Sequence, residues 1–488
     1  MIIVVLKVAF ILPGEDVLFR KLWTTGVPYA IRELNILLFL LNNFDNIFSW
    51  YFILEYMDFQ TVLKRLDKFV SYEDVKKIPY NEENFDLGRV RDFLKKWGVD
   101  YSKLKFVHVG GSKGKGTVCA LVAHYLFNAG YKVGMFTSPH ILDITERIWL
   151  NGGNISRQKF AEYIGEIMKI ISRENFYGLT YFEVLMIIAF KLFTDEGVDY
   201  VVLEVGFGGR LDATNIVTPS VSVLTMVEKE HADVFGGTVS KILDEKLGIV
   251  KPHVPFVVGC QCAHIKALIW KKVVGIAKKF KSSVRVFYVD EEVSAFHAKD
   301  YAIGISPTKD GVFDKAKISN AFTALVVLKV LLGSVDVEKF KDAFNKLNLP
   351  GRVFVKNVGN KTVVFDMAHT KRSIHNLIKF LKKRFVGKKF VFIFAALQGK
   401  DVSGMLKKIY PVVGRLFLTE AHEKRKIPVS DLKKIVEKIG YKNVFCESVA
   451  VKAYKRALKD FKKDQVIVVC GSHFLLGKIL KLFLRHSG

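Results

Sequence analysis

Short apolar runs alternate with longer segments of helical periodicity along most of the chain. Residues 105–109 read KFVHV, a compact apolar run, and residues 114–130 have the length and the terminal glycine of a helix. Further apolar runs lie at 132–138, 198–206, 219–227 and 254–259. Buried strands that alternate with helices predict a mainly parallel sheet of the doubly wound type.

A second series of the same kind follows Pro350. Its apolar runs lie at 361–369, 388–397, 414–420, 442–448 and 464–472. Between the two series the helical pattern stops at Pro350 and Gly351, which are typical of a boundary. Since 488 residues are many for one core, the sequence predicts two α/β domains, at 57–349 and 350–488.

The first 56 residues stand apart from this alternation. They are strongly apolar, but charged residues interrupt every run before it reaches the ~20 residues that would span a bilayer. Met57 begins an amphipathic helical segment, and we expect residues 1–56 to be an atypical extension produced by the choice of start site. Anchoring to a membrane surface is the alternative, and a stable membrane span is not expected.

The formal net charge is +27, and this value leaves several classes of partner open. It fits nucleic acid, an anionic membrane surface or small polyanionic substrates. Lysine pairs are scattered along the chain rather than gathered in one tail, so solvated helix surfaces explain the charge equally well.

The five cysteines form no CxxC pair and no regular framework. This pattern fits a reducing, cytoplasmic setting and does not fit a zinc site. Cys260 and Cys262 are expected to be buried apolar residues.

The stretch VHVGGSKGKGTVCA, at 107–120, contains a glycine-rich turn between a strand and a helix. Glycines such as Gly114 and Gly116 let backbone N–H groups approach phosphate oxygens, and Lys115 supplies a neutralising charge. Thr117 would open the helix. The pattern predicts a phosphate-binding loop and makes the first domain P-loop ATPase-like, although the glycine after the lysine departs from the common form.

Two further residues follow predicted strands. Glu204 ends an apolar run, where a buried carboxylate needs a partner, and magnesium near phosphates is a suitable one. Arg210 is the alternative partner. His231 has a similar position after the next run, where a neutral imidazole would complete a metal site.

These motifs together resemble one family. GGSKGKGT, MFTSPHILDITERIWLNG, LTYFE, LEVGFGGRLDATN, EKLGIVK, LPGR, DMAH and CGS occur in the order seen in folylpolyglutamate synthases and dihydrofolate synthases. That family lies within the Mur ligase superfamily of ATP-dependent amide ligases. The resemblance runs from about Met57 to the carboxyl terminus, and it implies a central ATP-binding domain followed by a smaller Rossmann-like glutamate-ligase domain.

The resemblance implies that ATP phosphorylates a substrate carboxylate and that L-glutamate attacks the acyl phosphate, releasing ADP and phosphate. This chemistry needs positioning and charge neutralisation more than a side-chain nucleophile. By motif, the ATP contacts are Gly114, Lys115, Gly116, Thr117, Asn320, Arg352 and Asp366. The implied magnesium positions are Ser138, Glu204, His231 and Lys246, the last as a carbamylated lysine. The implied catalytic residues are Lys115, Lys246 and His231.

The substrate side is also carried over by motif. It comprises Thr180, Tyr181, Phe182, Glu183, Leu211, Asp212, Ala213 and, near the glutamate, His369. Tyr181 and Phe182 serve equally well as core residues at a helix start. Three departures weaken adenine and glutamate recognition: Ser112 and Lys113 in the loop, DMAHT in place of DGAHN, and Ala316 and Lys317 where a histidine–glutamine pair is usual.

The expected partners are therefore small molecules, namely folate or dihydropteroate, L-glutamate and ATP with magnesium. The protein is expected to be a cytoplasmic monomer that does not bind nucleic acid. Two rival classes remain. A P-loop NTPase acting on nucleic acid would use the positive charge for phosphates, but would not need TSPH or EVGFGGRLDATN. A Mur-type ligase with another carboxylate substrate would normally carry a separate domain before the loop, and only about 50 residues separate Met57 from Val107.

Overall fold

The computed structural model describes residues 59–69, 79–230, 234–291, 315–347, 351–421 and 425–484. The chain divides into two compact units, residues 1–65 and 66–488. Helix α5 (Phe59–Leu66) reaches the end of the first unit and carries Lys64 and Arg65 in its last turn, where positive charge favours the helix dipole. The predicted extension at 1–56 lies outside the described residues, and the domain boundaries at 57 and 350 stay predictions.

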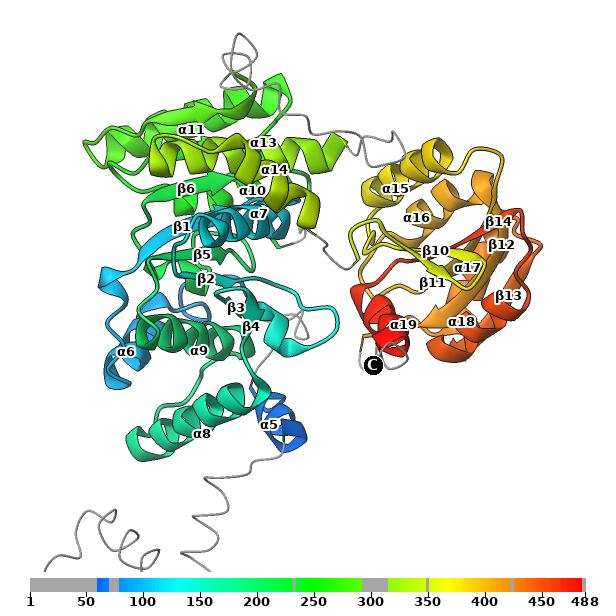
Figure 1. Cartoon of the computed structure of the whole chain (residues 1–488), viewed down its shortest axis with the longest axis horizontal. Helices are drawn as coiled ribbons and strands as arrows, with labels where there is room; N and C mark the ends of the chain where they lie inside the picture. The colour runs from blue at the N-terminus through cyan, green and yellow to red at the C-terminus, as the bar shows by residue number, and fades with distance from the viewer. Residues whose placement is uncertain are drawn as a thin grey trace, which may run out of the picture. The chain divides into compact units, whose positions relative to one another are not determined.

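Within the second unit, residues 79–347 build what we call the first lobe around an eight-stranded sheet (Figure 1). The strand order is β4-β3-β2-β5-β1-β6-β7-β8. The bounds are β1 Lys105–Gly110, β2 Val133–Phe136, β3 Ile148–Leu150, β4 Gly153–Asn154, β5 Tyr200–Glu204, β6 Val221–Leu224, β7 Phe256–Val258 and β8 Val286–Tyr288. All pairings are parallel except those of β3, which runs antiparallel to β2 and β4.

Helices cover both faces of this sheet. Their bounds are α6 Leu87–Lys96, α7 Lys115–Asn128, α8 Arg157–Glu174, α9 Tyr181–Asp195, α10 Val239–Lys246, α11 Ala263–Lys279, α13 Lys315–Leu332 and α14 Val337–Lys346. On one face α13 and α14 pack against α7, and on the other α9 packs against β2 and α8. Because side chains alternate along a strand, Val107 and Val109 of β1 join the core under α7 while His108 faces the α9 side.

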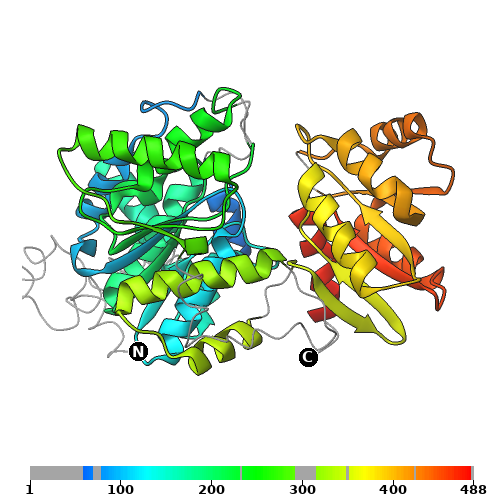
Figure 2. The same ribbon diagram turned by 90° about the horizontal axis from the view of Figure 1, so that it is seen from above.

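Residues 351–484, which we call the second lobe, form a six-stranded sheet in the order β13-β12-β11-β14-β10-β9 (Figure 2). The strands are β9 Phe354–Val358, β10 Lys361–Phe365, β11 Lys389–Phe394, β12 Val413–Glu420, β13 Val444–Val449 and β14 Gln465–Cys470. The helices are α15 Lys371–Arg384, α16 Val402–Ile409, α17 Val429–Ile439, α18 Ala450–Lys459 and α19 His473–Leu484. Only β9 pairs antiparallel.

The prediction of two mainly parallel α/β sheets is confirmed. The sequence analysis missed the antiparallel strands β3, β4 and β9 and the edge strand β8, all of which are short or only partly buried. Cys260 is half-buried and Cys262 is exposed, so the expectation that both are buried was wrong.

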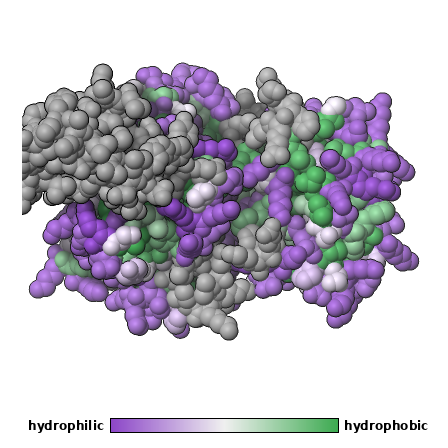
Figure 3. Space-filling view, turned by 90° about the horizontal axis from the view of Figure 1, so that it is seen from below, coloured by the Kyte–Doolittle hydropathy of each residue, from purple (hydrophilic) through white to green (hydrophobic). Residues whose placement is uncertain are grey.

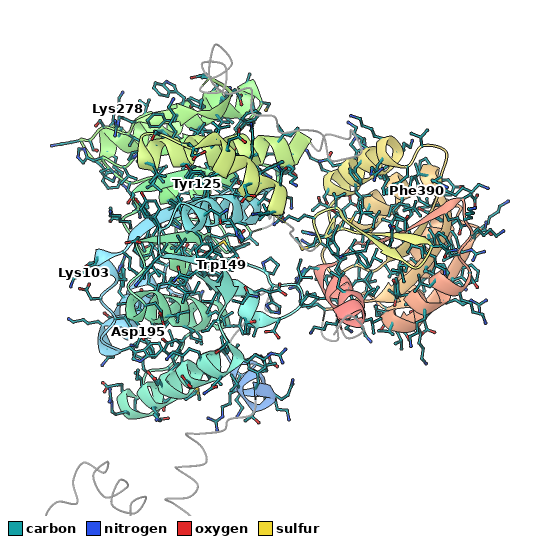
Figure 4. The ribbon with its side chains drawn as sticks, viewed as in Figure 1. Lys103, Tyr125, Trp149, Asp195, Lys278 and Phe390 are labelled. Carbon is teal, nitrogen blue, oxygen red and sulfur yellow. The ribbon has the colours of Figure 1, made fainter. Side chains whose placement is uncertain are left out.

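The cores of the two lobes are apolar, and their surfaces are polar. Tyr125 and Trp149 lie inside the first lobe and Phe390 lies inside the second (Figure 4). On the face drawn in Figure 3, hydrophilic residues form most of the coloured surface and hydrophobic residues form smaller patches. None of the described helices has both the length and the apolar character needed to cross a bilayer.

Candidate active site

A cavity of about 1470 Å³ opens at the carboxyl ends of β1, β5 and β6 in the first lobe. The start of the second lobe and the amino-terminal end of α15 also line it. In open α/β sheets this edge is where ligands bind, because the strands end there and the loops diverge. The residues that the sequence analysis selected are mostly found along this cavity.

The glycine-rich loop connects β1 to α7 and needs glycine for steric reasons. Gly111 and Gly114 have φ values of 138° and 94°, which disfavour residues with side chains. A Cβ atom at Gly111 would lie 2.0 Å from Thr225 Oγ1, and one at Gly114 would lie 2.2 Å from Asn320 Oδ1. The loop therefore passes directly against β6 and α13, and Asn320 reaches it from outside.

Two lysines converge on this loop. Lys115 Nζ and Lys246 Nζ both donate to the Gly111 carbonyl oxygen, at 3.2 Å and 3.0 Å. Lys246 is buried, and burial, followed by the charge of Lys115, lowers its pKa to about 7. With this pKa much of Lys246 is neutral at pH 7, so Lys115 brings most of the positive charge to the loop, which suits a polyanionic ligand.

Glu204, the last residue of β5, is buried beside this pair. Its Oε2 accepts a hydrogen bond from the Ser138 backbone N–H at 2.8 Å. Burial raises the pKa of Glu204, while Lys115, Ser138 and Arg352 lower it. Arg210, the alternative partner, instead forms ion pairs with Glu82 and Glu245, so that part of the interpretation was wrong.

Gly116, the glycine after the loop lysine, lies close to two charged side chains. A Cβ atom at Gly116 would lie 3.2 Å from Arg352 Nη2 and 3.4 Å from Glu204 Oε2. A Cβ atom there would touch Glu204 at ordinary contact distance and would require the Arg352 guanidinium to shift by a few tenths of an ångström. Gly116 lets a carboxylate from β5 and a guanidinium from the second lobe approach the same helix start.

The donor set at this point suits a hard cation. The Ser138 hydroxyl and the Glu204 carboxylate are oxygen donors, and magnesium in proteins is commonly bound by one or two carboxylates together with substrate phosphates. Within the described ranges, no cluster of three or more histidine, cysteine, aspartate or glutamate side chains is arranged to hold a metal. His231 lies outside the described residues.

The second lobe contributes Asp366 and His369 to the cavity. Asp366 Oδ2 accepts the Val353 N–H at 2.9 Å and Oδ1 accepts the Ala368 N–H at 2.8 Å, so the carboxylate is held by its own backbone. His369 Nδ1 lies 2.8 Å from the Met367 carbonyl oxygen. Burial, followed by the charge of Lys113, lowers the pKa of His369 to about 3, so the ring is neutral.

The LTYFE segment forms the start of α9. Thr180 Oγ1 accepts the Glu183 N–H at 3.2 Å and Glu183 Oε2 accepts the Thr180 N–H at 2.7 Å, which is a capping box. Glu183 also pairs with Arg89 at 2.8 Å. Tyr181 and Phe182 are half-buried and line the cavity. The polar groups of this segment are thus bound within the chain, and its rings face the cavity.

Leu211, Asp212 and Ala213 also line the cavity. Asp212 is buried and precedes a short 3-10 helix, η3 (Ala213–Ile216). Its Oδ2 accepts the Phe207 N–H at 2.7 Å and its Oδ1 accepts the Thr214 N–H at 3.0 Å.

Several cavity residues were not selected from the sequence. Arg147 is buried, donates to His140 Nδ1 at 3.0 Å and lies 5.6 Å from the centre of the Tyr181 ring. Tyr80 packs edge-on against Phe207 at 5.6 Å. Arg147 lies within the motif MFTSPHILDITERIWLNG, but the motif alone did not single it out, and Tyr80 depends on a partner far away in the chain.

The unusual loop residue Lys113 has a partner in the structure. Its Nζ pairs with Glu230 Oε1 at 2.9 Å, and its backbone N–H donates to Met226 O at 3.2 Å. Lys113 therefore ties the phosphate loop to the segment that follows β6.

The other departures also have structural roles. Thr370, which replaces asparagine in DMAHT, caps α15 through Ser373. Lys317 lies 4.5 Å from the centre of the Phe344 ring. In addition to these departures, Glu228 of the first lobe forms an ion pair with Arg372 of α15, with 3.1 Å between Oε1 and Nε. This ion pair joins the two lobes beside the cavity.

Comparison with known proteins agrees with this geometry. Residues 109–359 match the Mur ligase middle domain, and residues 351–473 match the Mur ligase glutamate ligase domain. A putative folylpolyglutamate synthase of Caenorhabditis elegans is 30% identical over 69% of this chain and 70% of its own length. The dihydrofolate synthetase of Saccharomyces cerevisiae is 26% identical over 82% of this chain and 98% of its own length.

Solved structures show the same architecture. The crystal structure of folylpolyglutamate synthase from Thermotoga maritima has a TM-score of 0.72 at 26% identity, covering 88% of this chain and 97% of that one. The Escherichia coli FolC structure with ADP has a TM-score of 0.71 at 26% identity, covering 88% and 98%.

A phosphate loop with converging lysines, faced by a second α/β lobe, defines an ATP-dependent ligase of the Mur ligase superfamily. Within that superfamily, the chain belongs to the folylpolyglutamate synthase and dihydrofolate synthase family.

Proposed function

We propose that this ligase joins the amine of L-glutamate to the carboxylate of a folate or of dihydropteroate, using ATP to activate the carboxylate as an acyl phosphate. The observation that carries the proposal is the convergence of Lys115 and Lys246 on the Gly111 carbonyl, beside Glu204 and opposite His369. Phosphoryl transfer needs a fixed positive group such as Lys115, because charge spreads over the phosphoryl oxygens in the transition state.

In this reading Gly114, Gly116 and Thr117 place their N–H groups toward the phosphates, and Lys115 neutralises the transferred group. Asn320 and Arg352 contact the nucleotide from α13 and from the start of the second lobe. Because Asp366 is held by two backbone N–H groups, its carboxylate has a fixed direction for the nucleotide. ATP would then contact both lobes, and their closure around it would exclude water from the acyl phosphate.

Ser138 and Glu204 would hold magnesium, with His231 and a carbamylated Lys246 as further ligands. Magnesium, when bound, neutralises charge on the phosphates. The pKa of about 7 supports carbamylation of Lys246, because only the neutral amine adds carbon dioxide and an ordinary lysine is almost wholly protonated at neutral pH. A homologous structure from Yersinia pestis, 25% identical, contains AMPPNP and a manganese ion.

The neutral His369 would lie near the incoming glutamate. A ring with a pKa of about 3 is a weak base, so its role would be to accept a hydrogen bond from the attacking amine and orient it rather than to take its proton. On the opposite side, Tyr181 and Phe182 offer ring surface to a flat substrate, and Arg147 offers positive charge to its carboxylate.

The test is incorporation of labelled glutamate in the presence of ATP and magnesium, with dihydropteroate and a reduced folate offered separately. Incorporation with dihydropteroate alone identifies a dihydrofolate synthase, with the folate alone a folylpolyglutamate synthase, and with both a bifunctional enzyme. No incorporation with either would reject the assigned substrates. ATP turnover that DNA or RNA stimulates without glutamate would favour the rival NTPase, and a cytoplasmic monomer free of nucleic acid stays a prediction.

A further inference from the structure

His108 is a buried histidine in the centre of β1, two residues before the phosphate loop begins. Its Nε2 lies 2.9 Å from Thr214 Oγ1, across the α9 face of the sheet. Its Nδ1 is buried and has no hydrogen-bond partner among the described residues. Buried polar groups in proteins are normally hydrogen-bonded, so a buried imidazole with only one bonded nitrogen is not explained by packing alone.

The hydrogen bonds around Thr214 have a defined direction. The Thr214 hydroxyl donates to Asp212 Oδ1, and both oxygens of this carboxylate also accept backbone N–H groups. The hydroxyl has a single hydrogen, so it must accept from His108 Nε2–H. His108 is therefore a neutral Nε2–H tautomer, which agrees with a pKa that burial lowers to about 3.

Asp212 is the end of this buried chain and the only member of the three that lines the cavity. Its carboxylate accepts from the Thr214 hydroxyl, the Thr214 N–H and the Phe207 N–H. Burial raises the pKa of Asp212, and these three donors oppose that shift. The chain therefore fixes the direction of the carboxylate, and its donors offset part of the upward shift that burial causes.

The neighbouring loop is held independently of His108. Asn215 Nδ2 donates to the Arg210 and Gly248 carbonyls at 2.9 Å and 3.1 Å, and the Arg210 N–H donates to Glu245 O at 2.8 Å. These hydrogen bonds hold the loop at points that do not involve His108. What His108 adds is a link from the Asp212 carboxylate to β1, the strand whose end carries the phosphate loop.

We propose that His108 and Thr214 are positioning residues for the folate-side substrate, because they hold the Asp212 carboxylate in the direction in which it accepts a hydrogen bond from that substrate. The inference rests on the proposed function and deepens it. The substrate must then present an N–H donor to an oriented carboxylate acceptor, and its alignment is set by the strand that also positions ATP. Neither His108 nor Thr214 lines the cavity, so both act through Asp212.

The test compares Thr214→Val, which removes the hydroxyl at nearly constant shape, with Thr214→Ser, which keeps it. Thr214→Val should raise the KM for the folate-side substrate about tenfold, the usual cost of losing a hydrogen bond to a charged group. The KM for ATP should stay at the wild-type value, and kcat should change less than KM. Thr214→Ser should restore the wild-type KM for the folate-side substrate.

A second pair of variants covers the case in which Thr214→Val does not fold. His108→Gln keeps an N–H donor of similar reach, and His108→Leu removes it, so His108→Leu should raise the same KM and His108→Gln should raise it less. Thermal unfolding of every variant excludes loss of folded enzyme. A wild-type KM in Thr214→Val, an equal rise in Thr214→Ser, or parallel changes in both KM values would overturn the positioning role while the ligase function stands. If the wild-type chain incorporates no glutamate, the proposed function and this inference both fail.

Discussion

The nucleotide side and the folate side of the cavity use their polar groups in opposite ways. On the nucleotide side, Lys115 and Lys246 share one backbone carbonyl. On the folate side, Thr180 and Glu183 satisfy each other in a capping box, and Asp212 is held by three donors from the chain.

On the nucleotide side, an anionic ligand complements positive charge of the protein. On the folate side, the ligand meets polar groups that are already hydrogen-bonded within the chain. Lys115 makes a single hydrogen bond to the Gly111 carbonyl and keeps most of its capacity for an anion, so its removal should weaken catalysis directly. Capping groups act through the backbone and positioning groups act through another side chain, so their removal should cost stability or alignment first. The predictions below separate these two kinds of site.

Lys115→Ala should have the largest effect, with ADP formation falling about 1,000-fold, because a fixed donor to the phosphoryl group is lost. Coupled-enzyme detection of ADP measures this, and the exposed Lys103→Ala serves as a charge-matched control. A Lys115→Ala enzyme that forms ADP at the rate of Lys103→Ala would reject the role of the loop.

Arg352→Ala should raise the KM for ATP about tenfold, because a charged hydrogen-bond donor near the loop is removed. Arg352→Lys keeps the charge but not the fork, and should recover only part of the loss. Steady-state kinetics at varied ATP concentration give both values. An unchanged KM for ATP in Arg352→Ala would place the nucleotide away from the second lobe.

His108→Gln should change the pH dependence of stability. The pKa of His108 is about 3 in the folded chain and 6.5 in the reference state, so between these values the unfolded chain binds one more proton. The free energy of unfolding of the wild type therefore falls as the pH is lowered below 6.5. For each pH unit of this decrease, the free energy of unfolding of His108→Gln should fall by up to about 1.4 kcal/mol less than that of the wild type.

Urea unfolding at pH 6.5 and pH 5 measures this difference, with the exposed His264→Gln as control. A slope in His108→Gln equal to that of the control would mean that His108 is not held neutral in the folded protein.

Thr180→Ala should have the smallest effect, a loss of about 1 kcal/mol in the free energy of unfolding, because α9 loses its cap. Thr180→Ser keeps the capping oxygen and should retain most of the stability. If Thr180→Ala instead raises the KM for the folate-side substrate at unchanged stability, the hydroxyl contacts substrate and the contrast between the two sides fails.

The sequence was informative where function depends on local backbone. The glycines of the phosphate loop, Glu204 at a strand end and the alternation of buried strands and helices were all readable, because spacing along the chain determines them. The sequence did not show why glycine is needed at position 116, because the neighbouring group is Arg352 from the other lobe. Lys113 with Glu230 and His108 with Thr214 depend likewise on strands that pair only after folding.

Residue type also proved ambiguous on the folate side. Thr180, Glu183 and Asp212 have the polar groups of ligand contacts, and each makes hydrogen bonds within the chain. Their neighbours in sequence do not reveal this, because a capping box and a binding motif use the same residues.

The central claim is that the converging lysines serve transfer of a phosphoryl group from ATP to a substrate carboxylate. It is tested most directly with a folate-side substrate whose reacting carboxylate carries oxygen-18, by mass spectrometry of the phosphate released during glutamate ligation. An acyl phosphate places one labelled oxygen in the phosphate for each amide formed. Amide formation with phosphate that carries no label would contradict the account.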